Sequence, residues 1–358
     1  MNIEVLVGAE EFWNSLEADI ARAKQQVYVQ TMTFEGDSVG KKLSASLLQS
    51  EALDRRLLID DYSNYVVNDT FIYQPSTLFN KSLLNEIKET TNTVKKMKAS
   101  DVLVKFTNPI NFWFLRYPLR NHKKLMIIDQ NICYIGGINF SEHNFQWNDM
   151  MLRYESSELV SALRKDFIRT WEGENSSLKK TIEDCDLFLC NGRRSSSIYE
   201  ELYDLIATAK DSIYVHSPYV TFPLMEHLKK AANSGVTVTF LTPENNNKPL
   251  LKHYLLHETS HSNFNLRLLP GVNSHLKALL IDDACLVSGS SNFDFVSYYC
   301  EQEIIIATRD RKAIGTFKDR ILNSDLARSN PLDTPPSSIK SVFSKQLLKL
   351  AEIGCRLI

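Results

Sequence analysis

Three features that this sequence lacks limit what the protein can be. None of its apolar stretches reaches the ~18 residues of a membrane span, so no transmembrane helix is expected. Its six cysteines include no Cys-x-x-Cys pair, and residues 1–10 lack the basic start and apolar core of an export signal, which favours reduced thiols in the cytosol. The net charge of −2 and the pI near 6.5 provide no general field for attracting polyanions, which argues against a nuclease that scans DNA.

What the sequence does contain is one short pattern that occurs twice. Each copy has the form His-x-Lys-x4-Asp and is followed, in the same register, by a glycine and an asparagine. The two copies are His122, Lys124, Asp129, Gly136 and Asn139, and then His275, Lys277, Asp282, Gly289 and Asn292. Because the copies lie 153 residues apart, the chain is predicted to consist of two homologous halves that share one site.

The residue types of this pattern favour chemistry at a phosphodiester. Histidine can attack an electrophile or exchange protons near neutral pH, lysine is a compact cation suited to phosphate oxygens, and asparagine adds neutral donors. Two histidines of opposite role fit a double displacement at phosphorus, in which one forms a phosphohistidine and the other moves the protons. Two lysines and two asparagines can balance the phosphate charge, so neither a metal nor another cofactor is expected.

The duplicated pattern resembles the signature of the phospholipase D superfamily, and the chain resembles the bacterial cardiolipin synthases most. Near the first copy, Arg120 and the run Gly136-Gly137-Ile138-Asn139 are similar to that branch. Near the second, Gly289-Ser290-Ser291-Asn292 and the downstream Glu303 are similar to it. Further similarities are Phe34-Glu35-x-Asp37-x-x-Gly40, Phe106-x-Asn108-Pro109, Trp147-x-Asp149, Ser217-Pro218-Tyr219 and Gly235-Val236-x-Val238.

The resemblance implies a role for each site residue. The catalytic set would be His122, Lys124, Asp129, His275, Lys277 and Asp282, with Lys124, Asn139, Lys277 and Asn292 binding the phosphate. Gly137, Asp149, Ser290 and Glu303 would support the site. By resemblance His122 is the nucleophile and His275 the general acid and base, while the sequence itself does not break the symmetry. Glu303 would orient a histidine; the same offset in the first half falls on Met150, so the adjacent Asp149 is expected to substitute.

Apolar segments alternate with helical patterns in both halves. Helices are expected at 12–23 and 198–209, and strands at 26–32, 56–60, 124–128, 212–217, 236–241 and 277–281. This order predicts an α/β fold with a mixed, largely parallel sheet flanked by helices in each half, and pseudo-twofold symmetry around one shared active site. The expected domains are 1–173, 174–332 and a basic amphipathic tail at 333–358.

Two segments fall outside the repeat. The apolar run at 110–115 is either a lid that meets lipid or an ordinary core element. In the tail, Ile339, Phe343, Leu347, Leu350 and Leu357 recur at helical spacing beside Lys340, Lys345, Lys349 and Arg356. Such a helix either lies on an anionic membrane or docks on its own protein, and similar tails of cardiolipin synthases favour the membrane.

One row of histidines outside the repeat also has a regular spacing. His253, His257 and His261 have the spacing of one helical face, but the residues Ser260 to Asn263 indicate a helix end at the last of them, so no metal is expected there.

The function expected from the sequence is a phosphatidyl transferase of the cardiolipin synthase type. Its partners would be a phospholipid, with phosphatidylglycerol expected, and an anionic membrane surface, at the inner face of the cell membrane. Both halves lie in one chain, so no dimer is needed for the site. A phospholipase D hydrolase remains an alternative, as does a nuclease, although the lack of positive charge disfavours nucleic acid.

Overall fold

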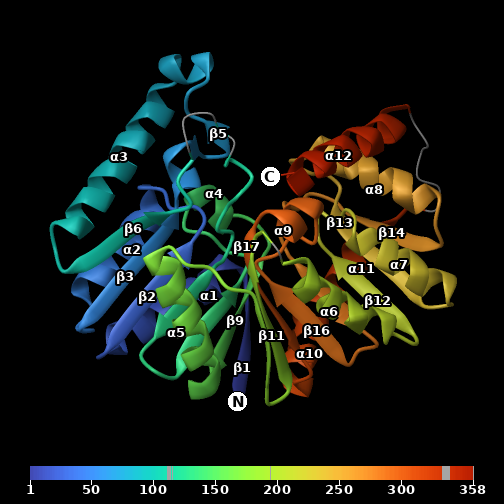
Figure 1. Cartoon of the computed structure of the whole chain (residues 1–358), viewed down its shortest axis with the longest axis horizontal. Coiled ribbons are helices and arrows are strands. Elements are labelled where there is room, and N and C mark those ends of the chain that lie inside the picture. The colour runs from blue at the N-terminus through green and yellow to red at the C-terminus, as the bar shows by residue number, and fades with distance from the viewer. Residues whose placement is uncertain (111–113, 115, 194, 333–338, 358) are drawn as a thin grey trace. The chain divides into compact units, whose positions relative to one another are not determined.

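The computed structural model describes the whole chain except residues 111–113, 115, 194, 333–338 and 358. It divides into two compact units, Met1–Ser176 and Ser177–Ile358. Figure 1 shows that each unit contains a twisted β-sheet with helices packed on it. The sequence places the division at residue 173 and separates the tail, whereas the structure groups residues 339–357 with the second unit.

The first unit has a seven-stranded sheet of order β1-β9-β8-β7-β2-β3-β6. Its strands are β1 Asn2–Val7, β2 Gln26–Thr31, β3 Asp54–Asp60, β6 Val102–Thr107, β7 Leu125–Ile128, β8 Ile132–Gly136 and β9 Met150–Glu155, beside the small hairpin β4 Val66–Val67 and β5 Thr70–Phe71. Its helices are α1 Gly8–Arg22, α2 Ser38–Gln49, α3 Lys81–Lys98, α4 Glu142–Phe145 and α5 Ser157–Glu172, with short 3-10 turns at Asp61–Asn64 and Pro75–Phe79.

The second unit has a nine-stranded sheet of order β10-β11-β17-β16-β15-β12-β13-β14-β18. Its strands are β10 Leu178–Ile182, β11 Cys185–Asn191, β12 Ser212–His216, β13 Thr237–Pro243, β14 Phe264–Leu269, β15 Ala278–Ile281, β16 Cys285–Gly289, β17 Gln302–Thr308 and β18 Asn330–Pro331. Its helices are α6 Ser196–Ala207, α7 Leu224–Asn233, α8 Pro249–Ser260, α9 Phe295–Tyr299, α10 Arg311–Phe317, α11 Asn323–Arg328 and α12 Ile339–Leu357, with a π-helical turn at Lys318–Leu322.

The two sheets repeat one strand order, since β9-β8-β7-β2-β3-β6 corresponds to β17-β16-β15-β12-β13-β14. The expectation of mixed sheets is confirmed, but the expectation that they are largely parallel is wrong. Only β2, β3 and β6, and their counterparts β12, β13 and β14, run parallel. The remaining pairs are antiparallel; among them, β7–β8 and β15–β16 are joined by short turns, which cannot make a parallel crossover.

Alternate residues of the central strands explain the layers of the first unit. Val27 and Val29 of β2 join a core that α1 and α2 cover. Tyr28 points to the other face, where its ring stacks on Phe167 of α5 with centroids 4.8 Å apart. The period of two therefore separates α1 and α2 from α5 across the sheet.

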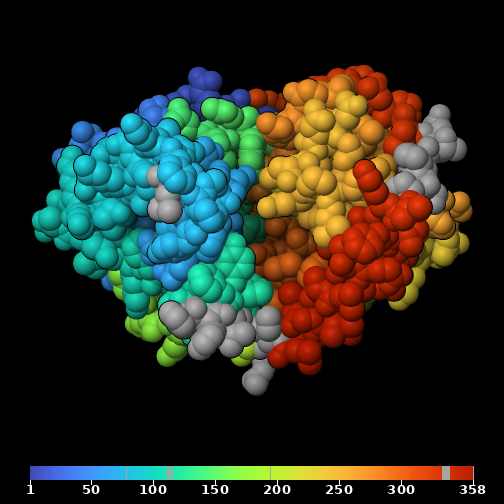
Figure 2. All heavy atoms as spheres, turned by 90° about the horizontal axis from the view of Figure 1, so that it is seen from above, coloured from blue at the N-terminus to red at the C-terminus, as the bar shows by residue number. Residues whose placement is uncertain are grey.

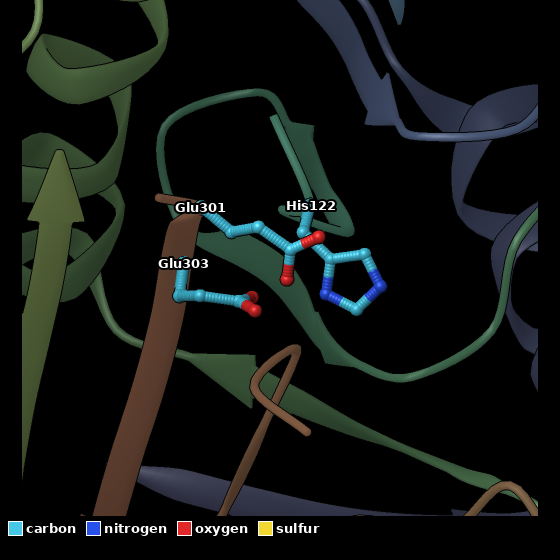
Figure 3. A group of neighbouring side chains, drawn as sticks. All are labelled: His122, Glu301 and Glu303. Atoms are coloured by element: carbon cyan, nitrogen blue, oxygen red, sulfur yellow. The ribbon is translucent and has the colours of Figure 1, made fainter. Parts of the chain in front are cut away.

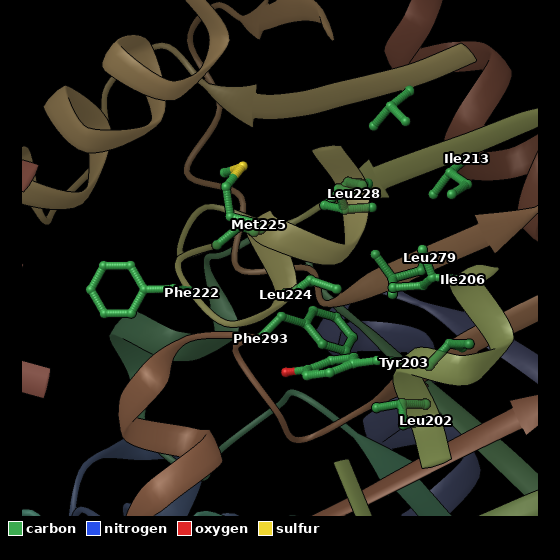
Figure 4. Close-up of a cluster of buried hydrophobic side chains, with 14 of the residues drawn as sticks. Leu202, Tyr203, Ile206, Ile213, Phe222, Leu224, Met225, Leu228, Leu279 and Phe293 are labelled. Atoms are coloured by element: carbon green, nitrogen blue, oxygen red, sulfur yellow. The ribbon is translucent and has the colours of Figure 1, made fainter. Parts of the chain in front are cut away.

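The second unit has a corresponding core between its sheet and helices α6, α7 and α8. Figure 4 shows part of this cluster, including Ile213 of β12, Leu279 of β15, Tyr203 of α6 and Leu228 of α7. On the other side of β12, the side chain of His216 meets Asp325 of α11 at 3.2 Å. The alternation along β12 thus reproduces that along β2.

The largest difference between the repeated sheets is the connection between β3 and β6, which carries the hairpin β4–β5 and the 18-residue helix α3. Lys95, Lys96 and Lys98 are exposed on α3. Of the apolar run at 110–115, only Ile110 and Phe114 are described. Phe114 meets the rings of Tyr65 and Phe71 edge-on, so this end of the run packs on the inserted segment. Whether the run is a lid stays a prediction.

Helix α12 lies on the surface of the second unit, beside α8, and is drawn in red in Figure 2. Its buried residues are Ser341, Ser344 and Leu348, and Lys345 forms an ion pair of 2.9 Å with Glu258 of α8. Part of the helix therefore docks on its own protein through a mostly polar face. None of the helices in the described part of the chain combines the length and apolar character needed to cross a bilayer.

A buried ion pair fixes α5 to the segment that precedes β7. Both carboxylate oxygens of Asp166 accept hydrogen bonds from Lys123 Nζ, at 2.8 and 2.6 Å, and both side chains are almost fully buried. Removal of one partner leaves an uncompensated charge in the interior, which costs much more than the intact pair contributes.

We therefore expect Lys123→Ala to lower the free energy of unfolding by about 3–5 kcal/mol, as measured by urea denaturation. Lys165→Ala removes an exposed lysine from the same helix and should change that free energy by less than about 0.5 kcal/mol. Equal effects of the two substitutions would contradict a stabilising role for the pair.

Candidate functional site

The first copy of the pattern lies in the extended segment that leads into β7. His122, labelled in Figure 3, and Lys124 are both buried, and Lys124 Nζ donates a 2.7 Å hydrogen bond to the carbonyl oxygen of His122. Residues two apart in an extended segment point to the same side. The single-residue spacing of His-x-Lys therefore places the imidazole and the ammonium group together.

The second copy repeats this arrangement before β15. Lys277 Nζ donates to the carbonyl oxygen of His275 at 2.7 Å and lies 2.8 Å from Nδ1 of the same histidine. The intervening residue points the other way in both copies: Lys123 toward Asp166, and Leu276 into the buried interior. The local geometry of the two copies is thus equivalent although the intervening residues differ.

The aspartate of each copy holds a turn of the backbone. Asp129 accepts hydrogen bonds from the backbone N–H groups of Lys24, Gln25 and Gln26, and its own N–H donates to Gln26 O at 2.8 Å. Its φ of 50° is in the left-handed region, which aspartate tolerates better than most residues. The carboxylate is fully engaged with the start of β2.

Asp282 makes the equivalent contacts with Lys210, Asp211 and Ser212 at the start of β12. Burial alone would raise the pKa of Asp282, but the three N–H groups and the charge of Lys210 lower it below its ordinary value. These contacts support a structural role for both aspartates rather than a role in proton transfer.

The two asparagines differ in their surroundings. Asn139 Oδ1 accepts from Thr31 Oγ1 at 3.2 Å and from Thr33 N at 3.3 Å, while its Nδ2 donates to Asn144 Oδ1 at 3.2 Å. In the second unit, Asn292 Oδ1 is buried and accepts no hydrogen bond within the described chain. The two asparagines occupy the same position in the repeat, but their side-chain hydrogen bonds differ: Asn139 is bound to the amide of Asn144, whereas Asn292 Oδ1 has no donor within the described chain.

Glu303 lies in a group of buried acids at the start of β17. Figure 3 shows Glu301 and Glu303 projecting from this part of the chain. Glu303 accepts from the hydroxyl of Ser290, and Ser297 Oγ lies 2.8 Å from Glu303 Oε1 and 3.0 Å from Glu301 Oε2. Burial and the nearby Glu303 raise the pKa of Asp294 to about 6, although the N–H of Ser297 opposes the shift.

Strand register places Asp149 at the position of Glu303. Gly136 pairs with Met151, whereas Gly289 pairs with Ile305. Asp149 stands two residues before the first of these partners, and Glu303 two before the second. The second copy therefore has one extra residue between its glycine and its acid, which is why a fixed offset from the sequence leads to Met150.

The glycine and serine that precede the asparagines match these acids. A Cβ atom built on Gly137 would lie 2.3 Å from Asp149 Oδ2, so a side chain at this position would overlap the carboxylate. At the corresponding position Ser290 donates its hydroxyl to Glu303. In both units a small residue thus lies against the acid: Gly137 against Asp149, and Ser290 against Glu303.

Asp60, at the end of β3, contributes to the first copy although it lies outside the repeated pattern. Asp60 accepts from Arg120 Nη1 at 2.7 Å and from the N–H of Asn121 at 2.6 Å. Burial raises the pKa of Asp60 to about 7 despite the lowering effect of Arg120. In the sequence, Asp60 is recognisable only as an aspartate at the end of a strand-like apolar run. The fold brings its carboxylate to the backbone of Asn121, the residue before His122.

The histidine row at residues 253–261 is separate from the two patterns along the chain. His257 is buried in α8, and His261 ends this helix with its ring centroid 4.4 Å from that of His257. His261 Nδ1 also lies 2.8 Å from His257 O. The rings therefore interact with their own helix.

Comparison with known proteins agrees with the resemblance. The family model described as "Cardiolipin synthase, PLD-like domain" matches residues 16–171 and 202–324. Cardiolipin synthase 1 of Staphylococcus epidermidis is 28% identical, over 97% of this chain and 73% of the relative. The major cardiolipin synthase ClsA of Bacillus subtilis is 25% identical, over 90% of this chain and 69% of the relative.

Among solved structures, the phosphatidylserine synthase of Haemophilus influenzae is similar in fold. It aligns with 99% of this chain and 93% of its own, with a TM-score of 0.71 at 16% identity. At that identity the match concerns the fold alone, and it agrees with two mixed sheets flanked by helices. Since the family model matches most of the sequence, the chain belongs to the cardiolipin synthase family of phospholipase D-like enzymes.

Proposed function

We propose that this enzyme transfers a phosphatidyl group from one phosphatidylglycerol molecule to the glycerol headgroup of another, forming cardiolipin and releasing glycerol. The observation that carries the proposal is the repeated geometry in a chain of this family: each lysine ammonium lies 2.7 Å from the carbonyl of the histidine two residues earlier. A reaction in two displacements requires two such histidines.

In the proposed reaction, His122 attacks phosphorus and the P–O bond to the departing glycerol breaks. His275 gives this glycerol a proton, so a phosphatidyl–histidine intermediate and neutral glycerol result. His275 then removes a proton from the terminal hydroxyl of a second phosphatidylglycerol. The resulting oxygen attacks phosphorus, cardiolipin forms, and His122 is regenerated.

Lys124, Lys277, Asn139 and Asn292 are the proposed phosphate-binding groups. Both ammonium groups are buried and held by carbonyl oxygens, so they keep their positions as charge develops on the phosphate oxygens. The unpaired Oδ1 of Asn292 leaves its amide less constrained than that of Asn139. We therefore assign the more rigid half of the proposed clamp to Asn139.

We further propose that α12 attaches the enzyme to the anionic inner face of the cell membrane. The five apolar residues that the sequence analysis identified on this helix all face solvent: Ile339, Phe343, Leu347, Leu350 and Leu357. An apolar stripe on a docked helix fits the boundary between headgroups and acyl chains. Exposure of such an apolar stripe to water is unfavourable, which also supports an interaction site on this face.

Fewer basic side chains of α12 are available to contact lipid than the sequence predicts. Lys345 pairs with Glu258, and Arg356 Nε lies 3.0 Å from Glu352 on the same helix. Lys340 and Lys349 are exposed and remain the two cations best placed to meet lipid phosphates. Each such cation contributes roughly 1 kcal/mol near an anionic surface.

The function is tested by supplying phosphatidylglycerol labelled in its headgroup and in its acyl chains, with single-stranded DNA offered under the same conditions. We expect label from the acyl chains in cardiolipin, label from the headgroup in free glycerol, and intact DNA. Phosphatidic acid in place of cardiolipin would indicate hydrolysis. Cleavage of DNA without lipid turnover would overturn the proposal.

Single substitutions test the roles of the two histidines. His122→Ala and His275→Ala should each reduce turnover by at least about 10³-fold, because the two side chains act in one sequence of steps. After a quench in neutral denaturant, which avoids the acid cleavage of a phosphorus–nitrogen bond, only His275→Ala should retain label on the protein. His253→Ala is the matched control and should keep full activity; label on His122→Ala would reverse the assigned roles.

Membrane attachment is tested by Leu350→Glu, which places a charge in the exposed stripe of α12. We expect weaker sedimentation with phosphatidylglycerol vesicles and little change in the hydrolysis of a small soluble phosphodiester. Leu53→Glu changes another exposed leucine, in the first unit, and is the control. Equal vesicle binding by both variants and the unchanged protein would show that α12 is only a packed helix.

A further inference from the structure

An acidic cavity in the first unit has no part in the proposed reaction. It has a volume of about 430 Å³ and is bounded by the loop between β2 and α2, by α3 and by α4. Its lining includes Glu35, Asp37, Asn85, Glu86, Glu142 and His143. Two of these residues belong to the Phe34-Glu35-x-Asp37-x-x-Gly40 motif, to which the proposed reaction gives no role.

Three carboxylates converge in this cavity. One oxygen each of Glu35, Asp37 and Glu86 lies within 4.8 Å of the others. The convergence follows from close packing between the loop and α3: Gly36 N donates to Thr90 Oγ1 at 2.7 Å, and a Cβ atom on Gly36 would lie 2.3 Å from Thr90 N. The fold therefore brings together three groups that repel one another when ionised.

Glu35 provides a second, independent observation. Its side chain is 99% buried, and Oε1 accepts a hydrogen bond of 2.9 Å from Asn68 N. Oε2 is also buried and accepts no hydrogen bond within the described chain; it forms an ion pair of 3.5 Å with His143 Nδ1, whose pKa burial lowers but Glu35 raises above its ordinary value. A buried carboxylate oxygen with no donor is costly unless a cation is close.

We propose that this cavity binds one divalent metal ion that prefers oxygen ligands, with calcium favoured over magnesium, and that Glu35, Asp37 and Glu86 supply the carboxylate ligands. Calcium accepts six to eight oxygens in flexible geometry, whereas magnesium requires a near-ideal octahedron. The cavity can also supply amide oxygens, from Asn85 and Gln146, and has room for water.

Asp37 has limited capacity as a ligand, which restricts how the ion is held. Its Oδ1 accepts from Val39 N and Gly40 N at the start of α2, and its Oδ2 accepts from the N–H of Glu142. Oδ1 thus has both lone pairs occupied, whereas Oδ2 retains one for a metal. Glu35 and Glu86 would therefore supply the principal charges, and the ion would join α3 to the loop before α2.

The site is connected to the first copy of the catalytic pattern by the short helix α4. Asp37 accepts from Glu142 at the start of α4, and Asn144 of the same helix accepts from Asn139 Nδ2 at 3.2 Å. The proposed ion stabilises the fold around Asn139 without touching His122 or His275. The inference does not depend on which phosphodiester the enzyme uses.

A proton is the alternative to a metal for balancing the charge. Burial and the neighbouring Glu35 raise the pKa of Glu86 to about 7. A proton shared between these two residues would respond to pH but not to calcium. Measurements at pH 8, with and without metal, separate the two cases.

The experiment uses the full chain, first treated with EDTA and then dialysed. Calorimetric titration with calcium chloride at pH 8 should give one ion per chain, and the thermal midpoint of unfolding should rise with calcium and fall again with EDTA. Magnesium chloride should bind more weakly. A midpoint that changes with pH but with neither metal would overturn the proposal.

Glu86→Gln keeps the shape of the side chain but removes its charge, and should weaken calcium binding by roughly tenfold or more. Glu89→Gln is the matched control, because Glu89 lies one turn further along α3, lines the same cavity and pairs with Lys41. Its affinity should stay within about twofold of the unchanged protein. If both variants bind calcium equally well, the assigned ligands are wrong. This comparison does not require a substitution at the buried Glu35, which could prevent folding.

Discussion

The arrangement of both His-x-Lys segments depends on one kind of interaction, the binding of three successive backbone N–H groups by an aspartate. Asp129 and Asp282 each receive these groups at the start of a central strand, β2 or β12. The contact aligns that strand with the one that follows the His-x-Lys segment. Because side chains alternate along an extended chain, this register also decides which way the histidine and lysine point. The third member of each pattern therefore acts through the backbone.

The two units use this arrangement with different supporting residues. Asp149 packs over the bare backbone of Gly137, whereas the longer Glu303 is held by hydroxyl groups and accompanied by Glu301. Only the first unit has the long connection with α3, and only there does Asp60 secure the backbone before the histidine. Such differences fit the proposed reaction, in which one histidine bonds to phosphorus while the other moves protons, since these tasks need different surroundings.

The molecule also carries features that the reaction does not require. On α12 the buried residues are Ser341, Ser344 and Leu348, while Phe343 and most of the leucines face solvent. In the first unit, the buried Glu35 and the half-buried Asp37 and Glu86 converge on a cavity between α3 and the loop before α2. Apolar groups exposed to water and like charges held together are both unfavourable in isolation. We interpret each as a surface for a partner outside the chain: the proposed membrane for α12 and the proposed metal ion for the cavity.

The sequence by itself determined the duplication, the mixed α/β class and the strands that follow each His-x-Lys pair, because these depend on local periodicity and spacing. It did not determine the antiparallel pairings, the correspondence of Asp149 with Glu303, or the contact of Asp60 with the segment before His122. Those features depend on strand register and on residues about 60 positions apart in sequence. The apolar spacing of α12 was also readable, but not the face that docks. Only tertiary packing decides which side of a helix is covered, since periodicity describes the helix without its neighbours.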